Sequence, residues 1–282
     1  MLIYLRSYGQ LCNRLWSILP ALSLSMERKE KLYILFNNPN DIKLFPNIEK
    51  CENLHVVTNR DYRIISSALY RLLNFMNPNS DLSTLGSRDH KIYVINSWKH
   101  IYDHSFITKY KEDILRIFSF NASTEEKVSR FFENFHGVTV GVHVRRGDYK
   151  SWRKGHYYFN DIVYIKKMEC IRKQLIAEGI DCRFIICSNE PFEATDTELP
   201  ITRIPNASGI EDLCALSKCD YILGPPSSFS QWASFVGNVP LAFLMDEDQE
   251  LLLSDFNPIE RMNVFTNSKK LIDVNGVEFK IE

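Results

Sequence analysis

Two adjacent arginines and an aspartate, Arg145, Arg146 and Asp148, come directly after a run of alternating valines. The run, residues 138–144, has the β-branched apolar pattern of a buried strand. Charged side chains at the carboxyl end of a strand lie where open α/β sheets bind their ligands. A guanidinium is a planar, permanent cation, so the pattern predicts an anion site, and phosphate fits it best. If the strand continues, His143 and Arg145 share one face and Arg146 lies on the other.

A second stretch suited to anions lies further along the chain, at residues 220–232. It predicts a strand that breaks at Gly-Pro-Pro, residues 224–226, followed by a helix that Ser227 and Ser228 open. Serines at such a position usually cap the helix. They also present hydroxyl and backbone N–H groups at the positive end of the helix dipole, which is a ready site for phosphate. Both interpretations are open on the sequence.

Two other stretches are further candidates. Residues 8–14 form a turn ahead of a predicted helix, as a phosphate loop does, but they lack the Gly-x-Gly-x-x-Gly spacing and the Walker lysine. They fit a loop that faces a ligand and fail as a dinucleotide fingerprint. The acidic run at residues 246–248 fits either a solvated turn or an acidic metal-binding motif.

These candidates need elements that bring strand ends and helix starts together. In the first half, the apolar pattern predicts strands at 2–5, 31–36 and 92–95 and helices at 11–26 and 64–75. This βαβ opening predicts a parallel sheet with right-handed crossovers. Residues 123–126 match a capping box that starts a helix ending near Phe135, with Gly137 as its left-handed cap. A domain boundary is therefore expected near residue 136.

A second α/β series follows this boundary. Its predicted strands are 138–144, 183–187, 221–223 and 241–244, and its predicted helices are 161–178, 210–217 and 229–236. Residues 271–272 and 277–279 are expected to form a short strand or a docking segment. The predicted fold class is therefore α/β, with two Rossmann-like domains facing a cleft. The N-terminal domain spans 1–136 and the C-terminal domain spans 137–282.

Composition narrows the function classes. The chain has 282 residues, 45% of them hydrophobic, which is ample for a large core, and a net charge of -1 excludes a global basic field for nucleic acid. The seven cysteines are odd in number and lack zinc-knuckle spacing, so free thiols in a reducing compartment are expected. The sequence shows no signal-peptide pattern and no apolar run of membrane-spanning length. These features predict a soluble cytoplasmic protein.

Four stretches together resemble a known family. Residues 143–149, His-Val-Arg-Arg-Gly-Asp-Tyr, resemble the signature of the α-1,2-fucosyltransferase family and of the wider fucosyltransferase superfamily. Residues 9–14 resemble the family's first loop, and residues 186–189 resemble a strand that ends in Ser-Asp or Ser-Asn. Residues 212–217 together with 227–230 resemble the late nucleotide motif. The resemblance spans nearly the whole chain and is least clear in the middle of the first half.

The resemblance implies a GT-B fold, an inverting mechanism, GDP-fucose as donor and no metal or other cofactor. The donor-binding residues that it implies are Asn13, His143, Arg145, Asp212, Ser227, Ser228 and Phe229. Arg145 would hold the β-phosphate, His143 and Asp212 would contact guanine, and the two serines would contact the diphosphate. Arg145 and Asp148 are the implied catalytic residues. Asp148 is either the base for the acceptor hydroxyl or a group that only orients Arg145 or Arg146.

The expected function is transfer of fucose from GDP-fucose to a glycan hydroxyl, in α-1,2 linkage, during bacterial-type surface polysaccharide or oligosaccharide synthesis. The expected partners are the GDP-sugar donor and a glycan acceptor, without nucleic acid. Two alternatives stay open, namely a GT-B enzyme that uses another nucleotide sugar and a non-catalytic sugar-nucleotide-binding protein. Cys12 favours the binding protein, because it replaces a glycine that the family usually has and its side chain limits how closely the backbone can approach a ligand.

Overall fold

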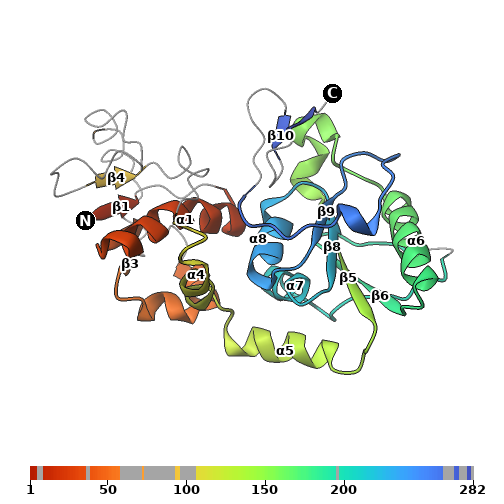
Figure 1. Ribbon diagram of the computed structural model, residues 1–282, viewed down its shortest axis with the longest axis horizontal. Helices are drawn as coiled ribbons and strands as arrows, with labels where there is room; N and C mark the ends of the chain where they lie inside the picture. The colour runs from red at the N-terminus through yellow and green to blue at the C-terminus, as the bar shows by residue number, and fades with distance from the viewer. Residues whose placement is uncertain are drawn as a thin grey trace. The chain divides into compact units, whose positions relative to one another are not determined.

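The computed structural model describes residues 1–4, 9–35, 39–57, 72, 93–95, 106–194, 197–262, 270–272 and 278–280. The chain forms two compact units, Met1–Asn121 and Ala122–Glu282. Figure 1 shows helices and strands in both units. Each unit contains a parallel sheet, which confirms the predicted α/β class.

The first unit contains a four-stranded sheet in the order β3-β2-β1-β4. Its strands are β1 (Leu2–Tyr4), β2 (Leu32–Leu35), β3 (Leu54–Val57) and β4 (Tyr93–Ile95), and neighbouring strands are parallel. Helix α1 (Leu11–Arg28) connects β1 to β2, as the βαβ pattern predicted, and is buried along most of its length. The other described helices of this unit are α2 (Pro39–Leu44), the 3-10 helix η1 (Pro46–Lys50) and α4 (Lys111–Ile117). The helix predicted at 64–75 lies outside the described residues except at Leu72.

The second unit contains a five-stranded parallel sheet in the order β7-β6-β5-β8-β9. Its strands are β5 (Val138–Val144), β6 (Cys182–Ser188), β7 (Ile201–Thr202), β8 (Tyr221–Gly224) and β9 (Leu241–Phe243). Its helices are α5 (Ala122–Phe132), α6 (Asp161–Ala177), α7 (Gly209–Leu216) and α8 (Ser228–Gly237). The shorter elements are η3 (Gly147–Lys150), η4 (Trp152–Gly155), η5 (Leu253–Asp255) and the antiparallel pair β10 (Lys270–Ile272) and β11 (Glu278–Lys280).

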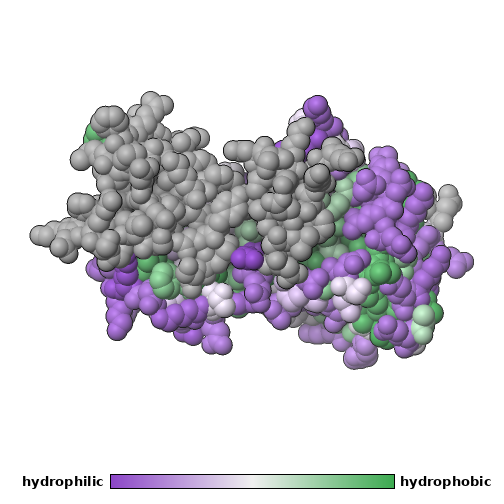
Figure 2. Space-filling view, turned by 45° about the horizontal axis from the view of Figure 1, so that its top comes forward, coloured by the Kyte–Doolittle hydropathy of each residue, from purple (hydrophilic) through white to green (hydrophobic). Residues whose placement is uncertain are grey.

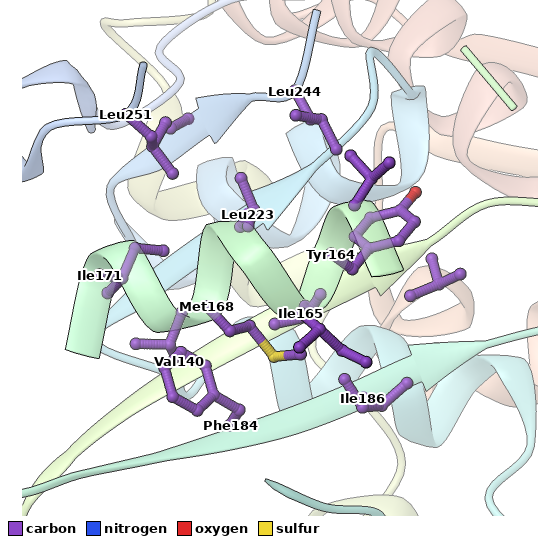
Figure 3. Close-up of a cluster of buried hydrophobic side chains, with 14 of the residues drawn as sticks. Val140, Tyr164, Ile165, Met168, Ile171, Phe184, Ile186, Leu223, Leu244 and Leu251 are labelled. Carbon is purple, nitrogen blue, oxygen red and sulfur yellow. The ribbon is translucent and has the colours of Figure 1, made fainter. Parts of the chain in front are cut away.

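The sheet of the second unit is covered on both faces, with α6 on one side and α7 and α8 on the other (Figure 1). The valines of β5 at 140, 142 and 144 face α6 and pack with Tyr164 and Met168 in one buried cluster (Figure 3). Gly141 faces the opposite way, so close to α7 that an added Cβ would meet the Leu216 side chain at 2.6 Å. The alternation predicted for this strand is therefore confirmed, and burial on both faces explains its continuous apolar character.

The division between the units falls upstream of the boundary expected near residue 136. Helix α5 belongs to the second unit, where Lys127 forms an ion pair with Glu211 of α7 at 2.9 Å and Glu125 forms one with Lys218 at 2.7 Å. These contacts fasten α5 to the second sheet's helices, which a local capping signal does not reveal. The roles assigned to the two domains stay predictions.

Two details of the predicted α5 are wrong. The helix begins at Ala122, so Ser123 lies inside it and does not cap it. Gly137 does not have positive φ and forms no left-handed cap. Close packing requires glycine at this position instead, because an added Cβ would lie 2.5 Å from the backbone carbonyl oxygen of Asp181.

Hydrophilic and hydrophobic residues are interspersed over the described surface visible in Figure 2. Among the described residues of the second unit, three large apolar side chains are exposed, those of Ile162, Ile176 and Leu252. Among the residues that the structure describes, no helix is both long and apolar enough to cross a membrane.

Candidate active site

The site predicted from the sequence lies at a switch point of the second sheet. From β5 the chain crosses through α6 to β6 on one side, whereas β8 joins β5 on the other side. The loops after β5 and β8 therefore leave neighbouring strands at the same edge of the sheet. In open parallel sheets, ligands bind outside the carboxyl ends of the strands at such a point. Arg145 follows β5, and Ser227 follows β8.

His143 is buried next to the amino end of α8. Its ring lies 5.0 Å from that of Phe229, measured between centroids. Gly224 permits this packing, because an added Cβ there would lie 2.9 Å from both the Cβ and the carbonyl oxygen of His143. Burial, together with the charge of Arg145, lowers the pKa of the imidazole to about 3. His143 is therefore neutral near pH 7, and its Nδ1 has no hydrogen-bond partner among the described residues.

Asp212 is brought to the same face of the sheet through Cys187. Cys187 pairs in register with His143 on the neighbouring strand, and its thiol donates to the backbone carbonyl of Asp212 at 3.7 Å. Burial raises the pKa of the Asp212 carboxyl to about 6, although the nearby Arg203 lowers it. Asp212 thus changes charge close to neutral pH. His143 and Asp212 therefore both lie on the face of the sheet covered by α7 and α8, and their shared contact with guanine stays a prediction.

Arg145 and Asp148 form an ion pair at 2.8 Å between Nη2 and Oδ1. The Arg145 side chain is 16% exposed and the Asp148 side chain 60%, so the pair has one end in solvent. The guanidinium also lies over the ring of Tyr149, with its carbon 5.5 Å from the ring centroid. Arg145 is held from two directions, and Asp148 keeps room for a further contact.

Arg146 has a different role from its neighbour. Since β5 ends at Val144, the alternation expected if the strand continued does not apply to the two arginines. Its guanidinium forms an ion pair with Asp161, the first residue of α6, and also donates to the Pro191 carbonyl at 3.4 Å. The Arg146 backbone N–H donates to Asn189 Oδ1 at 3.2 Å. Arg146 therefore ties the loop after β5 to α6 and to the loop after β6.

Ser227 is the N-cap of α8, and its hydroxyl accepts a hydrogen bond from the Phe229 N–H at 3.2 Å. The capping interpretation is thus confirmed for Ser227. The hydroxyl of Tyr149 donates to the carbonyl of Pro226, the residue before Ser227, at 2.5 Å. Through Tyr149, the structure brings the arginine loop and the amino end of α8 together.

Asn13 lies in the other unit, in the first turn of α1, where it is half-buried. The adjacent Arg14 forms a buried ion pair with Asp41 of α2 at 2.5 Å. Burial raises the pKa of Asp41, and Arg14 opposes that rise. This pair anchors the start of α1, and the contact of Asn13 with a donor stays a prediction.

The acidic run at 246–248 forms a turn in which Asp246 accepts a hydrogen bond from the Asp248 N–H at 2.8 Å. Among the described residues, no group of three or more His, Cys, Asp or Glu side chains is placed to hold a metal ion. The expectation of a metal-free mechanism stays a prediction.

Sequence reasoning gave no role to Tyr149 or Cys187, although both stood inside the quoted motifs. Tyr149 follows Asp148 by one residue, and an aromatic directly after a charged loop is a signal that the ring packs beneath that loop. Cys187 carries no such signal, because its role depends on the register between β5 and β6.

Several solved structures are similar to this chain. The fucosyltransferase NodZ from Bradyrhizobium has a TM-score of 0.52 and 15% identity, covering 86% of this chain and 95% of its own. A structure of NodZ α-1,6-fucosyltransferase soaked with GDP-fucose has the same score and identity, with 86% and 94% covered. A mutant of Arabidopsis thaliana FUT1 in complex with GDP has a TM-score of 0.51 and 13% identity, with 96% and 76% covered. At these identities the likeness shows the fold alone.

A search of curated protein sequences gives no match. The model of glycosyl transferase family 11 matches residues 43–247, which is most of the chain and includes the arginine loop and the amino end of α8. The chain therefore belongs to glycosyl transferase family 11.

Proposed function

We propose that this protein transfers fucose from GDP-fucose to a hydroxyl group of a glycan. One observation carries the proposal, the meeting of Arg145 and the amino end of α8 at the switch point of the second sheet. The family and the similar structures, some of which contain GDP-fucose or GDP, support a GDP-sugar donor. In this proposal the second unit binds the donor, and the first unit contributes to acceptor binding.

The leaving diphosphate gains negative charge as its bond to the anomeric carbon of fucose breaks, while the acceptor oxygen forms the new glycosidic bond to that carbon. Arg145 supplies a fork of N–H donors for the β-phosphate, and the first turn of α8, with Ser227 and Ser228, supplies hydroxyl and backbone donors. Preorganised donors of this kind contribute about 3–4 kcal/mol each to transition-state stabilisation. We therefore propose that the reaction needs no metal, since these groups take the place of a cation.

We propose guanine as the nucleobase that binds beside α7 and α8. Guanine presents N–H donors on one edge, and the Asp212 carboxylate accepts hydrogen bonds from these donors when it is ionised. The neutral imidazole of His143 supplies one donor and one acceptor, and Phe229 adds an aromatic face beside it. The three side chains come from different elements that converge on β5.

The acceptor hydroxyl must lose a proton as it attacks. Asp148 is our candidate base, because its carboxylate is 60% exposed beside Arg145. The second role left open for it, holding Arg145 in position, is supported by the ion pair between them. With one attack opposite the departing diphosphate, the fucose configuration inverts. We further propose a cytoplasmic enzyme of bacterial-type surface glycan synthesis that forms an α-1,2 linkage.

A donor panel tests the proposal. The purified protein is titrated with GDP, UDP and ADP by calorimetry, and nucleotide release is then measured with GDP-fucose and GDP-mannose over a set of glycan acceptors. We expect GDP to bind in preference to UDP and ADP, and GDP-fucose to be turned over, with the product linkage assigned by NMR. Turnover of another GDP-sugar alone would replace the donor. GDP binding with no transfer or hydrolysis would favour a non-catalytic binding protein.

A further inference from the structure

Tyr149 contacts both halves of the proposed diphosphate site. Its ring lies under the Arg145 guanidinium, and its hydroxyl donates to the Pro226 carbonyl at 2.5 Å. Pro226 directly precedes Ser227, the N-cap of α8. Tyr149 is therefore the described side chain through which the loop after β5 reaches the loop after β8.

The Tyr149 side chain is itself firmly held. It is 6% exposed and belongs to the buried cluster between the sheet and α6. The Trp152 ring packs on it with the centroids 4.7 Å apart, and Trp152 in turn packs on Tyr157 at 5.5 Å. A phenol fixed in this way has few alternative positions, so what it contacts is fixed with it.

The phenol hydroxyl keeps its proton over the whole working pH range. Burial raises the pKa of Tyr149 to about 12, against the opposing effects of Ser227 and Arg145. A protonated hydroxyl donates one hydrogen bond, here to the Pro226 carbonyl.

We propose that Tyr149 is a positioning residue that holds the Arg145 guanidinium and the amino end of α8 at the separation needed to contact one diphosphate together. This inference rests on the proposed function. Two anion-binding groups that are already spaced for the ligand bind it without first losing their own freedom. Tyr149 would touch neither phosphate, and its effect would pass through Arg145 and Ser227.

The test compares Tyr149→Phe with the matched variant Tyr221→Phe. Tyr149→Phe keeps the ring under Arg145 and removes the hydrogen bond to the Pro226 carbonyl. Tyr221 starts β8, at the end of the strand away from the site, and its ring packs edge-on against Phe256. GDP and GMP are titrated by calorimetry, because GMP lacks the β-phosphate assigned to Arg145. Thermal unfolding of each variant checks that it folds.

We expect Tyr149→Phe to weaken GDP binding by about five- to tenfold, the value of one buried hydrogen bond, and GMP binding by less than about twofold. Tyr221→Phe leaves both affinities unchanged. Tyr149→Leu, which also removes the ring from beneath Arg145, weakens GDP binding more than Tyr149→Phe does. A selective loss of GDP affinity is the signature, because a general loosening of the fold weakens both nucleotides alike.

Equal losses for GDP and GMP in Tyr149→Phe, or no loss for either, would overturn the positioning role while the donor assignment stands. If the unmodified protein does not bind GDP, the proposed function itself fails, and the positioning role fails with it.

Discussion

Replacing Arg145 with lysine tests whether the side chain acts through its paired N–H donors or through its positive charge alone. Lysine keeps one positive charge but cannot place two parallel N–H donors on a phosphate. The Arg145 side chain is only 16% exposed and lies over the Tyr149 ring, so a lysine at this position is confined to the same surroundings as the arginine. Any loss of activity then reports the missing second donor.

The expected loss follows from the chemistry of the leaving group. Removing one preorganised donor to a developing anion costs about 3 kcal/mol, which is a decrease of roughly 100-fold in kcat. The effect on folding is small, because the partner Asp148 is 60% exposed. Exposed ion pairs contribute at most about 1 kcal/mol to the free energy of unfolding.

Arg146→Lys is the matched control, since it makes the same change one residue away. Arg146 and Asp161 are 12% and 23% exposed, and the guanidinium also donates to Pro191. Losing part of this network lowers the free energy of unfolding by about 1–3 kcal/mol. We expect kcat to fall by less than about tenfold, because Arg146 is directed toward α6.

The assay measures GDP release from GDP-fucose in the presence of acceptor, together with urea unfolding of each variant. The two arginines should give opposite profiles, with activity lost at 145 and stability lost at 146. The reasoning is refuted if Arg145→Lys keeps turnover within about threefold of the unmodified protein. It is equally refuted if the two variants cannot be told apart.

Further perturbations test the other groups of the site. Asp148→Asn lowers kcat by about 100-fold or more if the carboxylate is the base, and by less than about tenfold if it only orients Arg145. Burial raises the pKa of Asp212 to about 6, and its ionised form accepts from guanine, so calorimetry should show GDP affinity falling as the pH drops through about 6. Asp212→Asn removes that component and leaves the titration of the GDP phosphate itself. Ser227→Ala loses the N-cap of α8, which lowers the free energy of unfolding by about 1 kcal/mol and reduces the rise in Tm that GDP produces. Transfer should persist in a chelator, and a loss that manganese restores would direct attention to the turn at 246–248.

The second unit was predictable to a large extent from local patterns. Its main strands and helices lie within a few residues of their predicted positions, because the strands are apolar runs and β5, β6 and β8 are each followed within three residues by glycine or proline. The sequence also predicted one anion site for Arg145 and Ser227, from their place in the same α/β series. The strand order, which puts β5 beside β8 and both loops at one edge of the sheet, came only with the structure.

Other features depend on contacts between distant residues. The different roles of Arg145 and Arg146 are set by Asp148 and Asp161, and nothing in the motif says which carboxylate each arginine meets. The short elements α2, η1 and β7 have too few residues for a periodic signal. Gly137 is another example. Glycine is required there by the backbone of Asp181, directly before β6, and the residues next to Gly137 in the sequence do not reveal that contact.

Gly224 places a restriction on how this site can change during evolution. The residue touches no proposed ligand, yet an added methyl group would collide with the backbone of His143 at 2.9 Å. Any larger residue must push β8 away from β5 and carry Pro226 and Ser227 with it. A substitution at this position is therefore expected to abolish function even in relatives that keep every proposed nucleotide-binding residue.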